Sequence, residues 1–276
     1  GLLGGLLVAG LGGGSSKTDT KAATDTSLKL TVQDGLIAGA KVYRDVVDAQ
    51  HQVGVTDANG QLLLNSALTG SGVLIAVGGT NKDTGLANTL NLKMSFAGGM
   101  SASSVMTPVT TLVTALLDSG SANSISAAES SVKQILGLSA QLNLSTYDPM
   151  AASNAGSADA LALRKAGAQI VQLSTQLPDA EQFFSSLAHE VTGSNNWGQL
   201  VQSENFVNAL LADQFPQLSA DQRASLMAGI VKDMAALGAV TSPDALSGAQ
   251  LNAAHLTVAL HQDTGTDRSE EHTSEL

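Results

Sequence analysis

The sequence predicts an α+β fold in two parts, a small antiparallel β-sandwich followed by an irregular antiparallel helical bundle. Across residues 28–98, apolar and polar residues alternate in short stretches separated by Gly, Asn and Asp, the pattern of strands in a sandwich. Across residues 104–262, the apolar residues recur every three or four positions, the spacing of amphipathic helices joined by short connections. We therefore expect a β-sandwich domain at 28–98 and a helical domain at 104–262.

The first part is expected to contain short strands bounded by turns. Residues 28–33 alternate between apolar and polar, and Asp34-Gly35 then provides a turn. The sequence Asp57-Ala58-Asn59-Gly60 is a strong turn signal, because Asp and Asn bond their own backbone and Gly tolerates positive φ. It predicts a hairpin that pairs residues 52–56 with residues 61–65. The remaining strands are expected within 37–47, 72–77 and 90–94.

The second part is expected to contain helices with recognisable ends. Thr107 and Pro108 suit the start of the first helix. Ser126 and Glu129 have the spacing of a capping box for a second helix, which Gly137 ends. The further helices are expected at 159–176, 179–193, 197–211 and 220–238, and from 243 onward.

The amino-terminal run resembles an export signal. Residues 1–14, GLLGGLLVAGLGGG, are too few to span a bilayer, which takes about 20 residues, and we expect them to be a signal remnant that begins inside its apolar segment. The run also resembles a lipoprotein cleavage box in which Leu11 stands where the lipidated cysteine would be, so the chain as written is not modifiable there. Residues 15–27 are expected to be a flexible linker. A Gly-rich end without function is the alternative.

The carboxyl-terminal residues 268–276, RSEEHTSEL, resemble the in-frame translation of a common sequencing adapter. We expect this segment to be an artefact rather than a natural acidic tail, and we exclude it from the search for functional residues. His272 and the neighbouring glutamates are therefore not taken as a metal or catalytic cluster.

Composition excludes several classes of function. The formal net charge is −11 and Lys and Arg form no cluster, which disfavours binding to nucleic acid. The chain has no cysteine, so it has no disulfide, thiolate metal site or cysteine nucleophile. Only 13% of the residues are charged, and the resulting polar but uncharged surface is typical of exported bacterial proteins.

Several phrases resemble the transthyretin-like, carboxypeptidase-regulatory-like β-sandwich of bacterial surface lipoproteins and adhesins. They are DGLIAGAKVY at 34–43 and TDANGQ at 56–61, and the resemblance continues over roughly 30–177. In related sequences the loop after the second strand often resembles a calcium loop. Here that loop, at 45–51, keeps Asp45 and Asp48 as metal candidates but lacks the repeated oxygens and the Gly that Ca²⁺ prefers. We therefore expect no metal and no cofactor.

The sequence offers no motif for catalysis. His189 and Glu190 are adjacent and so point in different directions on a helix, and no His-Glu-x-x-His spacing occurs. No Gly-x-Ser-x-Gly turn follows a strand. Phe183, Phe184 and Trp197 are expected to be core anchors, and we predict no catalytic residue.

These observations favour a non-enzymatic, lipoprotein-like protein of the bacterial cell envelope, located at the outer membrane, cell surface or periplasm. It would serve adhesion, scaffolding or ligand binding by presenting the loops at 45–51 and 81–84 on a rigid core. Its partner would be an envelope or extracellular protein or glycan, and a membrane would be reached only through the missing or altered anchor. The alternatives are a soluble periplasmic binding protein with a cleft between sandwich and helices, and a hydrolase accessory region whose catalytic part is missing.

Overall fold

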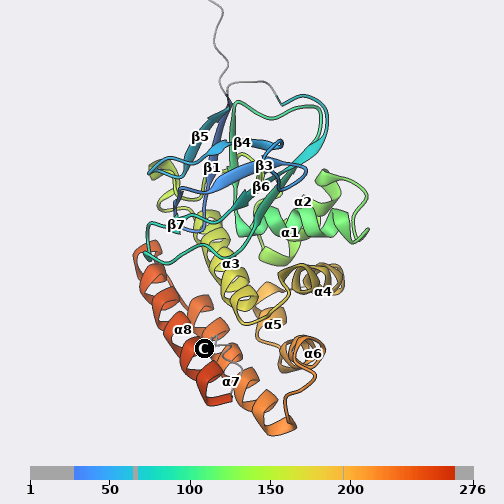
Figure 1. Ribbon diagram of the computed structural model, residues 1–276, viewed down its shortest axis with the longest axis vertical. Coiled ribbons are helices and arrows are strands. Elements are labelled where there is room, and N and C mark those ends of the chain that lie inside the picture. Colours follow the sequence, from blue (N-terminus) through green and yellow to red (C-terminus); the bar gives the residue numbers. More distant parts are fainter. Residues whose placement is uncertain (1–27, 65–67, 195, 265–276) are drawn as a thin grey trace, which may run out of the picture.

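The computed structural model describes the backbone of residues 28–64, 68–194 and 196–264, and the side chains as far as residue 254. Strands occupy one end of this part of the chain and helices the other, so the predicted α+β class is confirmed (Figure 1). The expected signal remnant at 1–14 with Leu11, the linker at 15–27 and the adapter-like segment at 268–276 lie outside the described residues.

One sheet contains four antiparallel strands in the order β4-β3-β6-β8. One of its two central strands, β6, has the most continuous apolar sequence, GVLIAV, as predicted for a strand in the sheet interior. The strands are β3 (Lys41–Arg44), β4 (Gln52–Val55), β6 (Gly72–Val77) and β8 (Leu92–Phe96).

A second sheet has three strands in the order β5-β1-β9, and its β1–β9 pair is parallel. The four-residue strand β9 was not expected, and it places residues 104–106 in a sheet rather than at the start of the helical part. A short antiparallel pair, β2 with β7, lies beside these sheets. The strands are β1 (Leu28–Val32), β2 (Ile37–Ala38), β5 (Gln61–Leu64), β7 (Thr80–Asn81) and β9 (Ser103–Met106).

The predicted hairpin between residues 52–56 and 61–65 is wrong. The turn itself forms, with the N–H of Gly60 donating to the oxygen of Asp57 at 3.0 Å. However, the Thr56 hydroxyl donates to the oxygen of Ile37 at 2.7 Å, and the N–H of Val32 donates to Gly60 at 2.8 Å. Because these bonds direct the chain from one sheet to the other, β4 pairs with β3 while β5 pairs with β1.

Eight α-helices follow within the described residues, and most ends agree with the predicted caps. Thr107 caps the first helix with Pro108 at its first turn, and Gly137 ends the second with φ of 65°. The helices are α1 (Pro108–Asp118), α2 (Ile125–Leu136), α3 (Ala158–Thr175), α4 (Ala180–Gly193), α5 (Trp197–Val201), α6 (Glu204–Gln214), α7 (Ala220–Gly238) and α8 (Pro243–Thr264), with a 3-10 turn at Ala152–Asn154.

Two helix boundaries differ from the prediction. Helix α2 is capped by Ser124, whose hydroxyl accepts from the N–H of Ala127 at 3.2 Å, and not by Ser126. The single helix expected at 197–211 is divided into α5 and α6, because the Ser203 hydroxyl caps a new helix start. None of the helices in the described part of the chain is long and apolar enough to cross a membrane.

Helix α1 joins the two parts by packing along β8, one of the two edge strands of the four-stranded sheet. The Thr111 hydroxyl accepts from the N–H of Lys93 at 2.8 Å, and the Thr110 hydroxyl donates to the oxygen of Lys93 at 2.8 Å. Because these hydroxyls occupy backbone groups that a further strand would use, the helix covers the sheet edge.

One buried apolar cluster runs from the sheets into the helices. Helix α3 lies centrally in Figure 1, where it contacts α1 on the side of the sheets and α7 and α8 on the other side. The largest fully buried side chains come from both parts, and they are Phe183, Leu30, Ile37, Leu74, Leu92, Met94, Met106, Leu112, Leu116, Ile170, Leu173 and Leu187.

Candidate functional site

The predicted loop at 45–51 connects β3 to β4 and is exposed along its length. Asp45 begins it with a left-handed backbone, φ 62°, which is uncommon for a residue other than Gly. Its Oδ1 accepts from the N–H of Val73 at 2.8 Å, and its Oδ2 pairs with Arg44 at 3.3 Å. The carboxylate of Asp45 therefore fixes the start of the loop to the neighbouring strand.

Asp48 fixes the other end of the same loop. Its Oδ1 accepts from the backbone N–H groups of Gln50 at 2.8 Å and His51 at 2.9 Å, and lies 2.7 Å from the His51 Nδ1. The bond with the His51 ring, followed by those backbone bonds, holds the pKa of Asp48 below its ordinary value. Both metal candidates thus bond within the protein, and the described residues contain no cluster of three or more His, Cys, Asp or Glu that could hold a metal ion.

The second predicted loop, at 81–84, is held by contacts with the rest of the protein. Asn81 is buried, and its Oδ1 accepts from the N–H groups of Asp83 and Thr84 at 2.9 and 3.2 Å. The Asp83 carboxylate lies 3.4 Å from the guanidinium of Arg164 on α3. The structure therefore separates the two predicted loops. The loop at 45–51 is exposed along its length, whereas the loop at 81–84 buries Asn81 and contacts α3 through Asp83, although Lys82 and Asp83 are themselves exposed.

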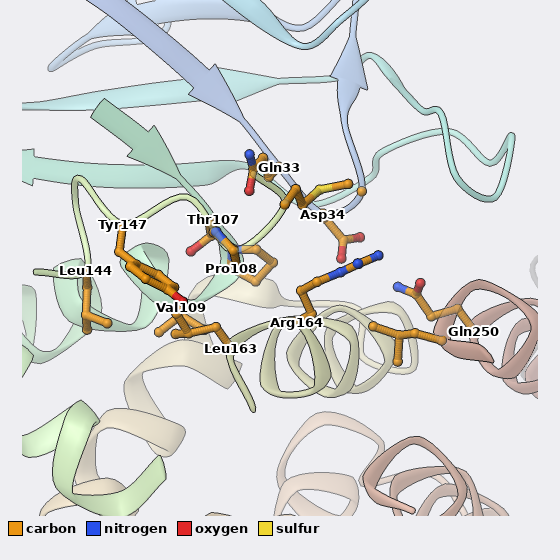
Figure 2. Close-up of a pocket in the computed structure, with 15 residues that line it drawn as sticks. Gln33, Asp34, Thr107, Pro108, Val109, Leu144, Tyr147, Leu163, Arg164 and Gln250 are labelled. Carbon is orange, nitrogen blue, oxygen red and sulfur yellow. The ribbon is translucent and has the colours of Figure 1, made fainter. Parts of the chain in front are cut away.

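A polar cluster centred on Asp34 lies at this junction, between the β1–β2 turn and helices α3 and α8. Figure 2 shows the Asp34 carboxyl directed toward Arg164 and Gln250. The side chain of Asn81 donates to the backbone oxygen of Asp34. Gly35 has φ of 69°, and a Cβ there would collide with Asn81, so glycine permits this close approach.

Burial raises the pKa of Asp34 to about 7. Hydrogen bonds with the side chains of Asn81 and Gln250 and the charge of Arg164 oppose the rise, whereas the charge of Asp83 adds to it. Desolvation therefore outweighs the available partners, and the carboxyl exchanges its proton near neutral pH. A perturbed carboxyl beside a cavity is a reason to consider this junction a functional site.

Two hollows share Asp34 and Gln250 in their lining. The smaller, drawn in Figure 2, has a volume of about 30 Å³ and lies between the β1–β2 turn, the start of α1, the loop at 144–150 and helices α3 and α8. Since a water needs roughly 10–15 Å³, this hollow suits one or two water molecules. Gln33 lines it, and its buried Oε1 has no partner among the described residues, while its Nε2 donates to Asp148 at 2.7 Å.

The larger hollow, which we call the Asp34 cleft, has a volume of about 270 Å³. Its walls are more apolar than polar and come from the loop after β7 and from helices α3 and α8. The residues that line it are Asp34, Asn81, Thr84, Leu86, Ala87, Asn88, Thr89, Ala168, Val171, Gln172, Thr175, Gln250 and Ala254.

The other residues considered in the sequence take ordinary structural positions. His189 and Glu190 are exposed on α4. Phe183 and Phe184 are buried with their ring centroids 5.1 Å apart, and the buried Trp197 donates from its Nε1 to Gln169 at 2.7 Å. The expectation that these three aromatic residues are core anchors is confirmed.

Sequence reasoning missed the Asp34 cluster. Asp34 was interpreted only as a turn residue, and the residues that surround it, Asn81, Arg164 and Gln250, come from distant parts of the sequence. No local spacing connects them, so no signal in the single sequence identified the cluster.

No family model matches the sequence, and neither a search of curated proteins nor a search of solved structures found a match.

Proposed function

We propose that this chain is a non-enzymatic, extracytoplasmic binding protein of the bacterial cell envelope that serves in adhesion, scaffolding or ligand binding. The loop at 45–51 is its proposed recognition surface, and an envelope or extracellular protein or glycan is its proposed partner. Export is proposed from the signal-like run at 1–14 and from the uncharged polar composition.

The observation that carries this proposal is the construction of the exposed loop. Val46 and Val47 are 49% and 48% exposed, although large apolar side chains are usually covered. The carboxylates of Asp45 and Asp48 fix the backbone on either side of them. A loop that is already ordered loses little conformational entropy when it binds, so the two valines are suited to contact a partner.

We propose further that the two sheets form a sandwich of the transthyretin-like, carboxypeptidase-regulatory-like kind. Support comes from the phrases at 34–43 and 56–61 and from side chains of both sheets that share one buried cluster. The parallel pairing of β9 with β1 departs from a purely antiparallel sandwich. In this proposal the module supplies the rigid base on which the 45–51 loop is displayed.

The recognition loop is tested by replacing its apolar tip. The 276-residue chain is mixed with isolated bacterial outer membranes and with peptidoglycan, and the bound fraction is measured by co-sedimentation. We expect wild-type protein to bind one of these, and the double variant Val46→Ser/Val47→Ser to bind about tenfold less. The matched control is Val55→Ser, because Val55 is 47% exposed on the neighbouring strand β4 and should be replaceable without loss.

Equal binding by the double variant and the wild type would refute the loop as the recognition surface. The location is tested separately by expressing the complete open reading frame in a Gram-negative host and fractionating the cells. We expect the protein in the periplasm or outer membrane. Recovery of the full-length protein in the cytosol would contradict the envelope assignment.

A further inference from the structure

The Asp34 cleft has the construction of a small-ligand site, which differs in place and chemistry from the 45–51 loop. Its volume of about 270 Å³ lies near the lower end of the roughly 300–1,000 Å³ typical of small-molecule pockets. Helices α3 and α8 form its apolar floor through Ala168, Val171 and Ala254. A ligand that fits must therefore be short and carry an apolar body.

The polar side chains of the cleft are mostly occupied by bonds within the protein. Asn81 bonds the backbone at Asp34, Asp83 and Thr84. Asn88 donates to the oxygens of Gly78 and Leu90 at 3.0 and 2.9 Å. These groups shape the cleft. The carboxyl of Asp34 also bonds with the side chains of Asn81 and Gln250, and among the described residues of the lining it is the group that can carry a negative charge toward a ligand.

The charges around Asp34 are not balanced. Two carboxylates, Asp34 and Asp83, share the single guanidinium of Arg164, which lies 3.4 Å from Asp83. Arg164 has the weakest of the influences on the pKa of Asp34, whereas desolvation has the strongest. A second cation beside Asp34 would add to the small stabilisation that Arg164 gives its ionised form.

We propose that the Asp34 cleft binds a small alkyl amine, with the ammonium group donating to the carboxylate of Asp34 and the carbon chain lying against Ala168 and Val171. The ammonium fits because the described residues of the lining include the carboxyl of Asp34 and no Lys or Arg. The alkyl chain fits because the floor of the cleft is apolar. This inference does not depend on the proposed function of the 45–51 loop, and either can fail while the other stands.

The experiment compares three probes of the same length, n-pentylamine, n-pentanol and pentanoate, by titration calorimetry on the 276-residue chain at about pH 8, where Asp34 is mostly ionised. We expect saturable binding of pentylamine with one site. Pentanol, which lacks the charge, should bind at least about tenfold more weakly, and pentanoate should not bind because its carboxylate meets that of Asp34.

Two variants locate the binding. Asp34→Asn keeps the shape of the side chain and removes its charge, and it should weaken pentylamine binding at least about tenfold. Val171→Phe fills the cleft and should abolish binding without touching a charged group, so it remains informative if Asp34→Asn fails to fold. Asp118→Asn is the matched control, because it removes an exposed carboxylate outside the cleft lining and should leave binding unchanged.

The proposal is overturned if wild-type protein shows no saturable binding of pentylamine. It is also overturned if Asp34→Asn and Val171→Phe, both folded by circular dichroism, bind pentylamine within about twofold of the wild type. Equal affinity for pentanol and pentylamine would overturn the assignment of an amine, since the charge would then contribute nothing.

Discussion

At the scale of single residues, Asp34 shows how an ordinary turn residue becomes an unusual acid. An exposed Asp in an Asp-Gly turn keeps its charge in water, but helices α3 and α8 close over this one. Its neighbours are amides and one shared guanidinium, and together they do not replace the lost hydration. Stability should therefore depend on the protonation of this carboxyl.

The direction of this pH dependence follows from the pKa of Asp34 in the folded and unfolded states. The pKa of Asp34 is about 7 in the folded protein and about 3.9 when unfolded, so between about pH 4 and 7 the folded state binds more protons. The free energy of unfolding should fall as the pH rises through this window, and the loss is complete above about pH 7. Asp34→Asn is neutral throughout and should not show this fall.

We therefore expect Asp34→Asn to be more stable than the wild type at about pH 8, by on the order of 2 kcal/mol after allowing for partial exposure of the side chain. At about pH 4 the two proteins should differ little, because Asp34 is then protonated. Urea unfolding at several pH values measures the difference. Burial also raises the pKa of Asp233, to about 6, but that carboxyl is present in both proteins, so its effect cancels. A stability difference between the two proteins that does not change with pH would contradict the raised pKa of Asp34.

At the scale of elements, helix α2 starts at a different residue from the one that its local sequence pattern predicts. The spacing of Ser126 and Glu129 is that of a capping box, but the helix begins two residues earlier and Glu129 is buried against the chain at 144–145. Ser124 has the extended backbone of a cap, φ −157° and ψ 158°, and its hydroxyl bonds the N–H of Ala127. Ser126 lies inside the first turn.

This difference can be measured with two matched substitutions. Ser124→Ala should lower the free energy of unfolding by about 1 kcal/mol, because one N–H of the first turn loses its partner. Ser126→Ala should be neutral or slightly stabilising, since Ala favours the helix interior. Both serines are exposed, so the two substitutions differ mainly in position. Thermal or urea unfolding of the two variants measures these changes in stability. If Ser126→Ala destabilised the protein more than Ser124→Ala, Ser126 would be the cap, as the sequence predicted.

The sequence predicted where strands and helices form better than it predicted which strands pair with each other. Period-two alternation at 28–32 and the apolar run at 72–77 correctly indicated strands, and Gly137 correctly ended a helix. The partner of β5 was wrong because the turn signal at 57–60 describes four residues, whereas the pairing depends on bonds of Thr56 and Gly60 to other strands. Strand β9 was missed because SSVM is too short to show a period.

The candidate site was predicted less well than the fold, for a related reason. Asp45 and Asp48 were located correctly in one exposed loop, because their spacing is local. The Asp34 cleft is assembled from a turn, a loop and two helices that are far apart in the sequence. Its composition depends on how α3 and α8 pack, and amphipathic periodicity says which faces are apolar but not which helix each face meets.

At the scale of the whole molecule, the strands and the helices share their core. Met106 on β9 and Leu112 and Leu116 on α1 are fully buried in the same cluster as Leu30 and Leu92 of the sheets. Helix α1 also covers the edge strand β8 through Thr110 and Thr111. Residues 28–98, taken by themselves, would lack β9 and α1 and would expose an open sheet edge and a broken core.

We therefore expect the 276-residue chain to unfold as one cooperative unit, although its sequence suggests two domains. The single Trp197 lies in the helical part and reports unfolding there by fluorescence, while amide exchange in β6 reports the sheets. The two denaturation midpoints should coincide. A fragment of residues 28–98 should give the poorly dispersed NMR spectrum of an unfolded chain. Separate midpoints, or a fragment that melts cooperatively, would show instead that the sheets are stable without the helices, and that the shared core contributes little to folding.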